Sequence, residues 1–440
     1  MKYYSTNGKA PIADLHKAVV KGLAEDRGLY MPEKINKLPK EFFDNIEKMS
    51  FQEIAYTVAS AFFGEDVDPD ALHDIVYDTL QFDCPVVNVK DNIYTLELFH
   101  GPTLAFKDAG ARFMARLLQY FIKQENKHKE VNVLVATSGD TGSAVANGFL
   151  GVDGIHVYVL YPKGKVSPIQ ECQFTTLGKN ITAIEVDGVF DDCQALVKNT
   201  FMDAELNEHM KLTSANSINV ARFLPQAFYY FNAYARMKEI ANTQHLSPNT
   251  QLVMCVPSGN FGNICAALFG HEMGLPIKRF IAANNANDIF YNYLQTGKYE
   301  PKPSKQTLAN AMDVGDPSNF ARIYDLYGKS HAKITSLISG ATYSDEQIKA
   351  TMRECYKDSG YILDPHGACG YQALKDGLQA GEVGVFCETA HPAKFKEKVD
   401  DILGIDVKIP ERLAAFMRGQ KQSVPMSKDF ADFKAFLMKQ

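Results

Sequence analysis

From residue 93 onward, the chain alternates short apolar runs with segments in which apolar residues recur at helical spacing. The runs read NIYTLEL, VNVLVA, GIHVYVLY, NITAIEV and QLVMCV. A loop of small residues and then a segment of helical period follow each of the middle runs. This alternation predicts parallel strands joined by crossover helices. Because it occurs in two blocks, 131–214 and 251–283, we expect an α/β fold with two open parallel-sheet lobes and a cleft between them.

Residues 1–92 have a different pattern. Apolar residues fall on one helix face over 13–24 and again over 51–64. The second stretch stops at Gly64, a residue type that commonly ends a helix. This part contains no loop suited to a phosphate, so we expect a mainly helical N-terminal segment that acts as a scaffold or lid.

The length of the chain supports a division into parts. A chain of 440 residues is too long for one hydrophobic core and favours about two to three domains. Together with the pattern, this predicts a helical segment over 1–92 packed on the larger lobe, a smaller α/β lobe over 93–225 and a larger α/β lobe over 226–440. An amphipathic helix around 428–438 is expected to pack on the outside.

The composition argues against several classes of protein. The formal net charge is −6, so no basic footprint for nucleic acid or anionic lipid is present. The apolar runs are far shorter than the ~20 residues of a membrane helix, and the start MKYYSTNGKA is not a secretory signal. Eight cysteines form no CxxC pair and eleven histidines show no HExxH spacing. We therefore predict reduced thiols, no metal site and a cytoplasmic location.

The first candidate for chemistry is VPSGNFGN at 256–263, between the run QLVMCV and the helix-like NICAALFGHEMG. Two glycines at a strand-to-helix turn let backbone N–H groups converge, and the helix dipole adds positive potential, so the turn suits a phosphate. It has no lysine and is therefore not a Walker P-loop, and it lacks the GxGxxG of dinucleotide sites. A tight turn that binds nothing would look the same, and this motif alone does not decide between them.

The second candidate is ATSGDTGSAVANGF at 136–149, where a loop rich in serine, threonine and glycine opens a helix after VNVLVA. Its hydroxyls, converging N–H groups and single carboxylate suit a carboxylate or phosphate oxyanion. Alternatively, Ser138, Asp140 or Thr141 only caps the helix. Capping and anion binding are compatible, so both interpretations stay open.

The third candidate is Lys107, in ELFHGPTLAFKDAGARFMARLLQYFI at 97–122. From Asp108 the apolar positions follow helical spacing, so the lysine lies at or just before a helix N-terminus. The helix dipole and the apolar residues 104–106 would lower the pKa of the lysine and free its amine as a nucleophile. A solvated surface lysine is the alternative.

A reactive lysine, a phosphate cradle and an oxyanion loop are the parts that a pyridoxal phosphate (PLP) enzyme needs. We therefore predict that pyridoxal 5'-phosphate is bound as a Schiff base on Lys107. An NAD-dependent oxidoreductase is disfavoured because GxGxxG is absent.

Nearly the whole chain resembles the threonine synthase family of bacteria and fungi, whose members are PLP enzymes of fold type II. The resemblance is carried by YYSTNG, GLAEDRGLYMPE, FHGPTLAFKD, TSGDTGSA, LYPKGKVSPIQ, TSANSIN, VPSGNFGN and ETAHPAKFKE, in that order. Two stretches depart from the family. Residues 5–8 read STNG and residues 26–29 read DRGL, where the family often has STRG and DGGL.

The resemblance implies roles for individual residues. Lys107 would form the Schiff base, and Thr389 would hydrogen-bond the pyridine nitrogen, with Glu388 as its rival. An ordinary strand end before Pro392 is the alternative interpretation of Thr389 and His391. The cofactor's phosphate would be held by Gly259, Asn260, Phe261, Gly262 and Asn263. The substrate's carboxylate would be held by Thr137, Ser138, Asp140 and Thr141. The substrate's phosphate would be held by Lys163, Lys165, Ser214, Asn216, Ser217 and Asn219.

The resemblance also implies the reaction and the partner. The small-molecule substrate would be O-phospho-L-homoserine, converted with water to L-threonine and phosphate by γ-elimination and β-addition. An amino-acid dehydratase of the same fold and a non-catalytic PLP-binding relative are the alternatives. We expect no nucleic-acid or membrane partner, and the oligomeric state stays open, with a monomer compatible with the sequence.

Overall fold

The computed structural model describes residues 1–125, 129–247 and 249–440, which form two compact units. The first unit comprises Met1, Met31–Phe106 and Phe223–Lys408. The second unit comprises Lys2–Tyr30, Lys107–Arg222 and Ile409–Gln440. Each unit is built around its own sheet, and the division of the chain into 1–92, 93–225 and 226–440 stays a prediction.

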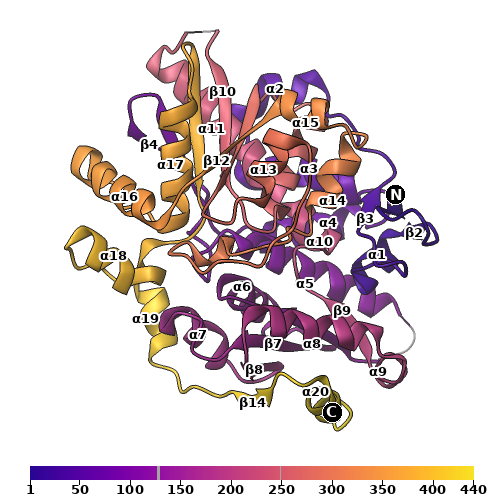
Figure 1. Ribbon diagram of the computed structural model, residues 1–440. Helices are drawn as coiled ribbons and strands as arrows, with labels where there is room; N and C mark the ends of the chain where they lie inside the picture. The colour runs from indigo at the N-terminus through magenta and orange to yellow at the C-terminus, as the bar shows by residue number, and fades with distance from the viewer. Residues whose placement is uncertain (126–128, 248) are drawn as a thin grey trace. The chain divides into compact units, whose positions relative to one another are not determined.

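The sheet of the first unit has six strands in the order β12-β11-β10-β13-β5-β4. Of these, β4, β10 and β12 are labelled in Figure 1. All neighbouring strands are parallel except β4 and β5, which are antiparallel. The strands are β4 (Val86–Lys90), β5 (Ile93–Glu97), β10 (Gln251–Pro257), β11 (Arg279–Asn284), β12 (Ile338–Thr342) and β13 (Glu382–Glu388). Every residue of β13 is buried, as expected for a strand covered on both faces.

Helices surround this sheet, and α17 packs against both β13 and β10. The helices of the first unit are α2 (Lys40–Asn45), η1 (Ile46–Lys48), α3 (Phe51–Phe63), α4 (Pro69–Thr79), η2 (Leu224–Gln226), α11 (Ala227–Gln244), α12 (Gly262–Glu272), α13 (Ile289–Thr296), η3 (Asn310–Met312), α14 (Phe320–Leu326), α15 (His331–Leu337), α16 (Asp345–Ser359), α17 (Pro365–Gly377), η4 (Pro392–Phe395) and α18 (Lys396–Leu403). The four-residue α10 (Val220–Phe223) contains the boundary between the units.

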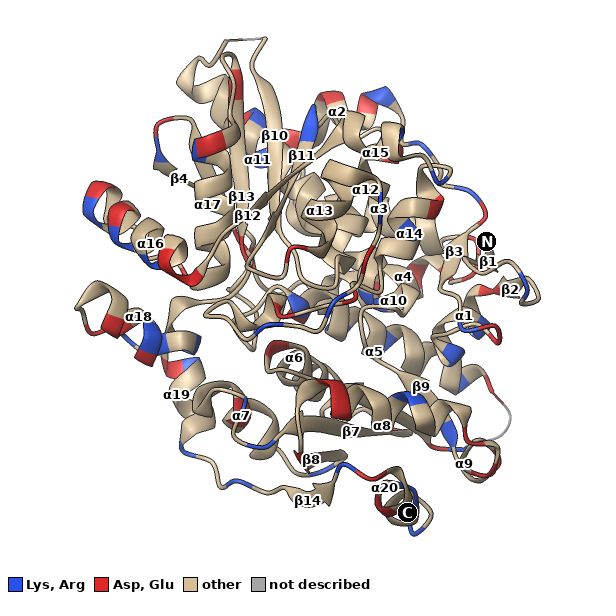
Figure 2. Cartoon of the chain, in the orientation of Figure 1, with Lys and Arg blue, Asp and Glu red and all other residues tan. Residues whose placement is uncertain are grey.

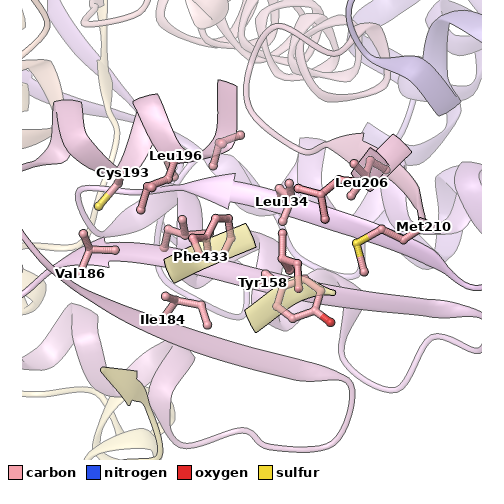
Figure 3. Packing of buried hydrophobic residues seen from close by; sticks show 14 residues of the cluster. Leu134, Tyr158, Ile184, Val186, Cys193, Leu196, Leu206, Met210 and Phe433 are labelled. Carbon is pink, nitrogen blue, oxygen red and sulfur yellow. The ribbon is translucent and has the colours of Figure 1, made fainter. Parts of the chain in front are cut away.

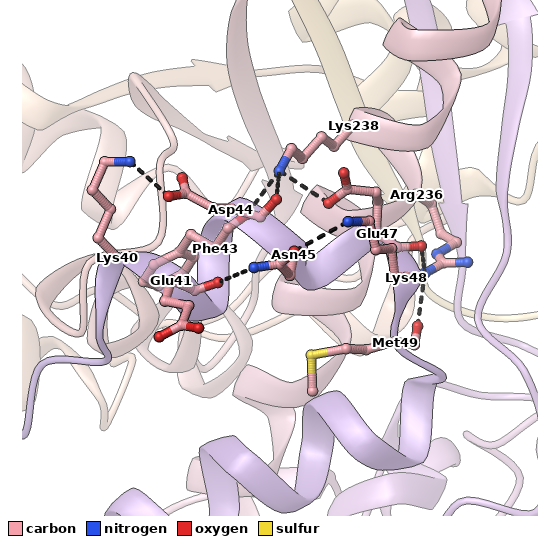
Figure 4. A network of polar contacts seen from close by, with 10 residues as sticks. All are labelled: Lys40, Glu41, Phe43, Asp44, Asn45, Glu47, Lys48, Met49, Arg236 and Lys238. Carbon is pink, nitrogen blue, oxygen red and sulfur yellow. Dashed lines mark hydrogen bonds and ion pairs between the residues drawn. The ribbon is translucent and has the colours of Figure 1, made fainter.

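Two basic side chains of α11 hold the α2–η1 turn (Figure 4). The Nζ of Lys238 donates to the carbonyls of Phe43 at 2.9 Å and Asp44 at 2.6 Å, and it forms an ion pair with Glu47. The guanidinium of Arg236 donates to the carbonyl of Met49 at 3.0 Å. A cation is favourable at a helix C-terminus, where carbonyls lack intrahelical donors, so these contacts explain how a short helix is stabilised there.

The sheet of the second unit has five parallel strands in the order β14-β8-β7-β6-β9. They are β6 (Val131–Ala136), β7 (Ile155–Pro162), β8 (Ile181–Asp187), β9 (Lys211–Ser214) and β14 (Val424–Ser427). The helices are α1 (Leu15–Lys21), α5 (Lys107–Gln124), α6 (Asp140–Phe149), α7 (Pro168–Thr175), α8 (Phe190–Met202), α9 (Ala204–His209), α19 (Glu411–Met417) and α20 (Phe430–Leu437). Figure 3 shows the core on one face of this sheet, where Phe433 of α20 lies among Leu134, Tyr158, Ile184 and Leu196.

The prediction of two parallel-sheet lobes with crossover helices is therefore confirmed, but the prediction that the N-terminal segment is mainly helical is wrong. A three-stranded sheet of order β2-β1-β3 lies there, formed by β1 (Lys2–Ser5), β2 (Ala13–Asp14) and β3 (Tyr30–Pro32). The pairing of β1 with β2 is antiparallel. These strands have two to four residues, too few for a period-two pattern to stand out. The predicted helix over 51–64 is confirmed as α3, which ends at Gly64.

Lys and Arg positions are interspersed with Asp and Glu positions along helices such as α16 and α18 (Figure 2). Within residues 1–125, 129–247 and 249–440, no helix combines the length and the apolar character that crossing a membrane requires.

Candidate active site

Lys107 is the first residue of α5, as the helical spacing after it predicts. Its Nζ donates to the hydroxyl of Thr141 at 2.7 Å. Because Thr141 belongs to the second candidate loop, the structure brings two of the three predicted motifs together within the second unit. The lysine amine is therefore held at the N-terminal ends of two helices, α5 and α6, where potential is positive.

The loop before α6 is organised by Thr137 rather than by a helix-capping side chain. The hydroxyl of Thr137 accepts from the backbone N–H groups of Gly139 at 2.9 Å and Gly142 at 2.8 Å. Gly139 is the N-cap with φ 145°, a conformation that favours glycine, and it has no side chain with which to cap the helix itself. The alternative that Ser138, Asp140 or Thr141 serves only as a cap is thus not what the structure has.

Asp140 also has a structural partner. Its carboxylate accepts from the Nε2 of Gln170 at 3.0 Å, and Asp140 is only 4% exposed. Thr137 is 1% exposed. Of the four predicted carboxylate contacts, Ser138 and Thr141 are the half-buried ones, so these two are the better placed to meet a ligand.

The remaining substrate candidates follow the carboxyl ends of β7 and β9. Lys163 and Lys165 are exposed and come directly after β7. Ser214 is the last residue of β9, and the Nδ2 of Asn216 donates to the carbonyl of Ala136 at the end of β6, at 3.1 Å. In a parallel sheet these strand ends lie at one edge, which is where ligands of open α/β sheets bind.

Asn219 differs from the other candidates, because protein groups occupy its side-chain amide. It is fully buried, and its Nδ2 donates to the carbonyls of Val19 at 2.9 Å and Ser214 at 3.1 Å. Its Oδ1 accepts from the N–H of Ala221. These bonds tie the TSANSIN segment to the end of α1, so Asn219 positions the segment, while Ser217 is half-buried.

The cradle at 258–263 lies in the first unit, between β10 and α12. Phe261 is the N-cap of α12 with φ 66°, and its ring packs on Phe290 at a centroid distance of 4.5 Å. The hydroxyl of Ser258 donates to the Oδ1 of Asn263 at 2.9 Å, and the Nδ2 of Asn263 donates to the carbonyl of Pro257 at 2.8 Å. The side chain of Asn263 therefore closes the loop on itself.

The backbone of this loop fits a phosphate. Among the described residues, nothing accepts from the N–H groups of Gly262 and Asn263, which begin α12. The helix has 11 residues, so its dipole adds to these two donors. These N–H groups are available to a phosphate, and the cradle stays a prediction.

A further segment packs on the cradle and was not predicted. A side chain at Gly259 would place its Cβ 2.7 Å from the carbonyl oxygen of Ala311 and 2.8 Å from the Cα of Met312. The segment is held by Asp313, which accepts from the hydroxyl of Thr307 at 2.7 Å and from the Nδ2 of Asn285 at 2.9 Å. Burial raises the pKa of Asp313 to about 6. The only sequence signal was the polar run Asn284–Asn287 after an apolar strand.

Thr389 follows β13 and lies beside the residues that precede the lysine. The N–H of Phe106 donates to the carbonyl of Thr389 at 2.8 Å, and Ala105 pairs with Ala390 in an isolated antiparallel bridge. Thr389 is 6% exposed, and its hydroxyl has no hydrogen-bond partner among the described residues. A buried hydroxyl without a protein partner is suited to a ligand atom such as a pyridine nitrogen.

Glu388 has different surroundings. Its side chain is fully buried, and its Oε1 accepts from the N–H of Asp364 at 2.7 Å. Burial, together with the neighbouring charge of Asp364, raises the pKa of Glu388 well above its ordinary value. The ring of His391 accepts from the N–H of Ala393 at 3.0 Å, and burial lowers the pKa of His391 to about 4.

Comparison with known protein families identifies the class of enzyme to which the chain belongs. Residues 82–387 match the family of pyridoxal-phosphate dependent enzymes, the range that contains Lys107 and the cradle. Residues 2–80 match the threonine synthase N terminus, and residues 367–437 match the threonine synthase C-terminal family. The chain is thus a PLP-dependent enzyme, and it belongs to the threonine synthase family.

Relatives and solved structures of threonine synthases match the chain over all or most of its length. The chain is 43% identical to a threonine synthase of Serratia marcescens, covering 100% of this chain and 99% of the relative, and 36% identical to that of Saccharomyces cerevisiae, covering 91% and 89%. The crystal structure of threonine synthase from Escherichia coli superposes with a TM-score of 0.92 at 43% identity and 100% coverage of both chains. A PLP-bound threonine synthase from Brucella melitensis superposes with a TM-score of 0.91 at 33% identity, covering 100% and 99%. The predicted family, class of enzyme and cofactor are confirmed.

Proposed function

We propose that the protein converts O-phospho-L-homoserine and water to L-threonine and phosphate. The observation that carries this assignment is the 2.7 Å hydrogen bond between the Nζ of Lys107 and Thr141, which holds a lysine amine against an oxyanion loop at the carboxyl edge of a parallel sheet. Family membership supports the assignment of that lysine as the Schiff-base residue.

The first unit supplies the groups that would hold the cofactor. The N–H groups of Gly262 and Asn263, in the loop that also contains Gly259, Asn260 and Phe261, would bind its phosphate, and the hydroxyl of Thr389 its pyridine nitrogen. When bound, PLP supplies an electron sink for the carbanions that both the elimination and the addition require.

The second unit supplies the groups that would act on the substrate. The amine of Lys107 is the base that would take the Cα proton and return protons later, and Thr141 keeps it oriented at 2.7 Å. Ser138 and Thr141 would bind the substrate carboxylate, with Thr137 and Asp140 holding their loop in shape.

The substrate's phosphate needs donors of its own. Ser214, Asn216 and Ser217, after β9, are the proposed hydroxyl and amide donors, with Lys163 and Lys165, after β7, as cations. A dianion bound by several such groups gains about 1.5–3 kcal/mol from each charge-assisted hydrogen bond. Such a phosphate site would favour O-phospho-L-homoserine over serine or threonine, the substrates of a dehydratase, because neither of them carries a phosphate.

The test is a product assay with pure protein. Incubation with O-phosphohomoserine should release threonine and inorganic phosphate in equal amounts, whereas homoserine should give no product. Lys165→Ala should raise the KM for the phosphorylated substrate without releasing PLP. Dehydration of serine or threonine much faster than phosphate release would identify the protein as a dehydratase instead.

A further inference from the structure

A chain of buried polar contacts in the first unit connects the residue before Thr389 with the segment that packs on the cradle. The Oε1 of Glu388 accepts from the N–H of Asp364 at 2.7 Å, and the Oδ2 of Asp364 lies 2.5 Å from the Nδ1 of His366. On the far side of the ring, the Nε2 of His366 accepts from the N–H of Ala311 at 3.1 Å. Glu388 and Asp364 are fully buried and His366 is 2% exposed.

We propose that His366 is a positioning residue. Through its hydrogen bonds to Asp364 and Ala311, it fixes the position of the phosphate cradle relative to Thr389, the residue proposed to bind the pyridine nitrogen. This inference rests on the proposed function, because it takes the cradle at 258–263 and Thr389 as the two ends of that site. Nothing in the catalytic assignment requires a histidine at this position.

The hydrogen bonds define the protonation state of the ring. A backbone N–H can only donate, so the Nε2 that receives the Ala311 N–H carries no proton. The Nδ1 therefore carries it and donates to Asp364. The imidazole acts as a rigid connector with one donor and one acceptor on opposite sides, and its ring packs on Phe395 at a centroid distance of 5.2 Å.

Asp364 anchors the connector at its other end. It is the N-cap of α17, and its Oδ1 accepts from the N–H of Gly367 at 2.7 Å. Burial alone would raise the pKa of Asp364, but His366, Glu388 and the N–H of Gly367 lower it below its ordinary value. A Cβ at Gly367 would lie 1.9 Å from the Oε2 of Glu388, so the start of α17 and the end of β13 are in direct contact.

At the other end of the connector, Ala311 lies directly against the cradle. Because a Cβ at Gly259 would lie 2.7 Å from the carbonyl oxygen of Ala311, the backbone of the 311–312 segment rests on the cradle with no side chain between them. Asp313, bonded to Asn285 and Thr307, fixes one side of this segment, and His366 fixes the other. Releasing Ala311 therefore removes support from the loop whose N–H groups would bind the phosphate.

Two variants of His366 separate positioning from general stability. His366→Phe removes both hydrogen bonds and keeps the ring against Phe395. His366→Asn keeps a donor near Asp364 but is too short to reach Ala311. If His366→Phe does not fold, His366→Asn decides the question alone. Both should weaken the equilibrium affinity for PLP about tenfold, with the absorption maximum of the bound cofactor unchanged.

Glu382→Gln is the matched control, because Glu382 is a buried carboxylate at the opposite end of the same strand, β13, where it pairs with Arg279. It should lower the melting temperature and leave PLP affinity as in the parent. If the His366 variants lower the melting temperature in the same way and still bind PLP as tightly as the parent, the residue is merely structural and the inference is overturned.

A third variant, Asn263→Ala, tests the cradle assignment separately from the role of His366. The side chain of Asn263 closes the cradle itself, so its loss should weaken PLP binding if the cradle holds the cofactor's phosphate. Weakened PLP affinity in Asn263→Ala with normal affinity in both His366 variants would remove the positioning role alone. Normal PLP affinity in Asn263→Ala as well would move the cofactor's phosphate to another part of the chain.

Discussion

At the scale of single residues, Glu388 and Thr389 are neighbours in the chain with different surroundings. The Oε1 of Glu388 accepts from the N–H of Asp364, whereas its buried Oε2 and the hydroxyl of Thr389 have no partner among the described residues. Thr389 also lies next to the residues that precede Lys107, because its carbonyl accepts from the N–H of Phe106. Thr389→Val should therefore slow turnover up to about tenfold, since a lost hydrogen bond costs ~0.5–1.5 kcal/mol, with PLP retained. Steady-state kinetics and PLP content measure this.

Glu388→Gln is the companion variant in that experiment. Burial and the neighbouring charge of Asp364 raise the pKa of Glu388 well above its ordinary value, which favours the neutral carboxyl, so an amide of the same shape should change turnover little. Normal kinetics in Thr389→Val together with a large defect in Glu388→Gln would reverse the assignment of the pyridine partner.

Arg27 offers a second prediction at this scale. It has φ 66° in the DRGL stretch, one of the two places where the sequence departs from the family pattern. A left-handed backbone conformation costs a non-glycine residue ~1–2 kcal/mol, which glycine avoids. Glycine in turn loses more conformational entropy on folding, which offsets ~0.5–1 kcal/mol of this gain. Arg27→Gly should thus stabilise the folded chain by about 0.5–1 kcal/mol, measured as a higher midpoint of urea unfolding.

The control for that prediction is Arg27→Ala, which removes the charge but keeps a Cβ at the same backbone angle. It should not raise the midpoint. Equal stabilisation by both variants would mean that the gain comes from the lost guanidinium and not from relief of backbone strain.

At the scale of elements, α20 is a helix whose apolar face completes the core of the second unit. Phe433 and Leu437 are fully buried, and Phe433 belongs to the cluster of Leu134 and Ile184 (Figure 3). Phe433→Ala should cost about 3–5 kcal/mol of stability, because it removes a large side chain from a packed core. Phe436→Ala, one turn away and only half-buried, should cost clearly less. Urea unfolding of both variants measures the difference, and equal losses would contradict the packing.

Elements with long apolar runs could be predicted, and those without could not. The runs VNVLVA and QLVMCV became β6 and β10 because buried parallel strands are apolar on both faces. The strands β1, β2 and β3 were missed, because their pairing partners and not their own residues define them.

The same limit applies to the site. Lys107 and the two loops could be proposed from the sequence because each lies at one strand-to-helix or helix-start junction, and the structure places each at the start of a helix. The sequence alone predicts Asn219 as a substrate contact, whereas its amide donates to the carbonyl of Val19, 200 residues earlier in the chain. Asp364 and His366 are two residues apart, but their contacts with residues 388 and 311 span 24 and 55 residues, so no local pattern could indicate the connection.

At the scale of the whole molecule, each unit is assembled from several separated stretches of chain. The second unit takes Lys2–Tyr30, Lys107–Arg222 and Ile409–Gln440, so its sheet includes β14 from the last stretch. Neither unit is therefore one continuous stretch of chain.

The stability of the molecule toward acid should depend on Glu382 in the first unit. Its carboxylate is 3% exposed and accepts from Arg279 at 2.7 Å and Lys278 at 3.0 Å. The hydrogen bonds of Arg279 lower the pKa of Glu382 from 4.5 to about 2, even though burial opposes the shift. Because the folded pKa lies below the unfolded one, the stabilisation is complete above pH 4.5 and is lost as the pH falls toward 2.

This shift is worth about 3 kcal/mol at neutral pH. Glu382→Gln should lower the free energy of unfolding at pH 7 by that order, and the difference from the parent should shrink as the pH falls, because the parent loses the same interaction by protonation. Urea unfolding of parent and variant between pH 2 and 7 measures the difference directly, and the other carboxylates cancel in it. A difference that stays constant over that range would show that the charge of Glu382 contributes nothing, and that its role is packing alone.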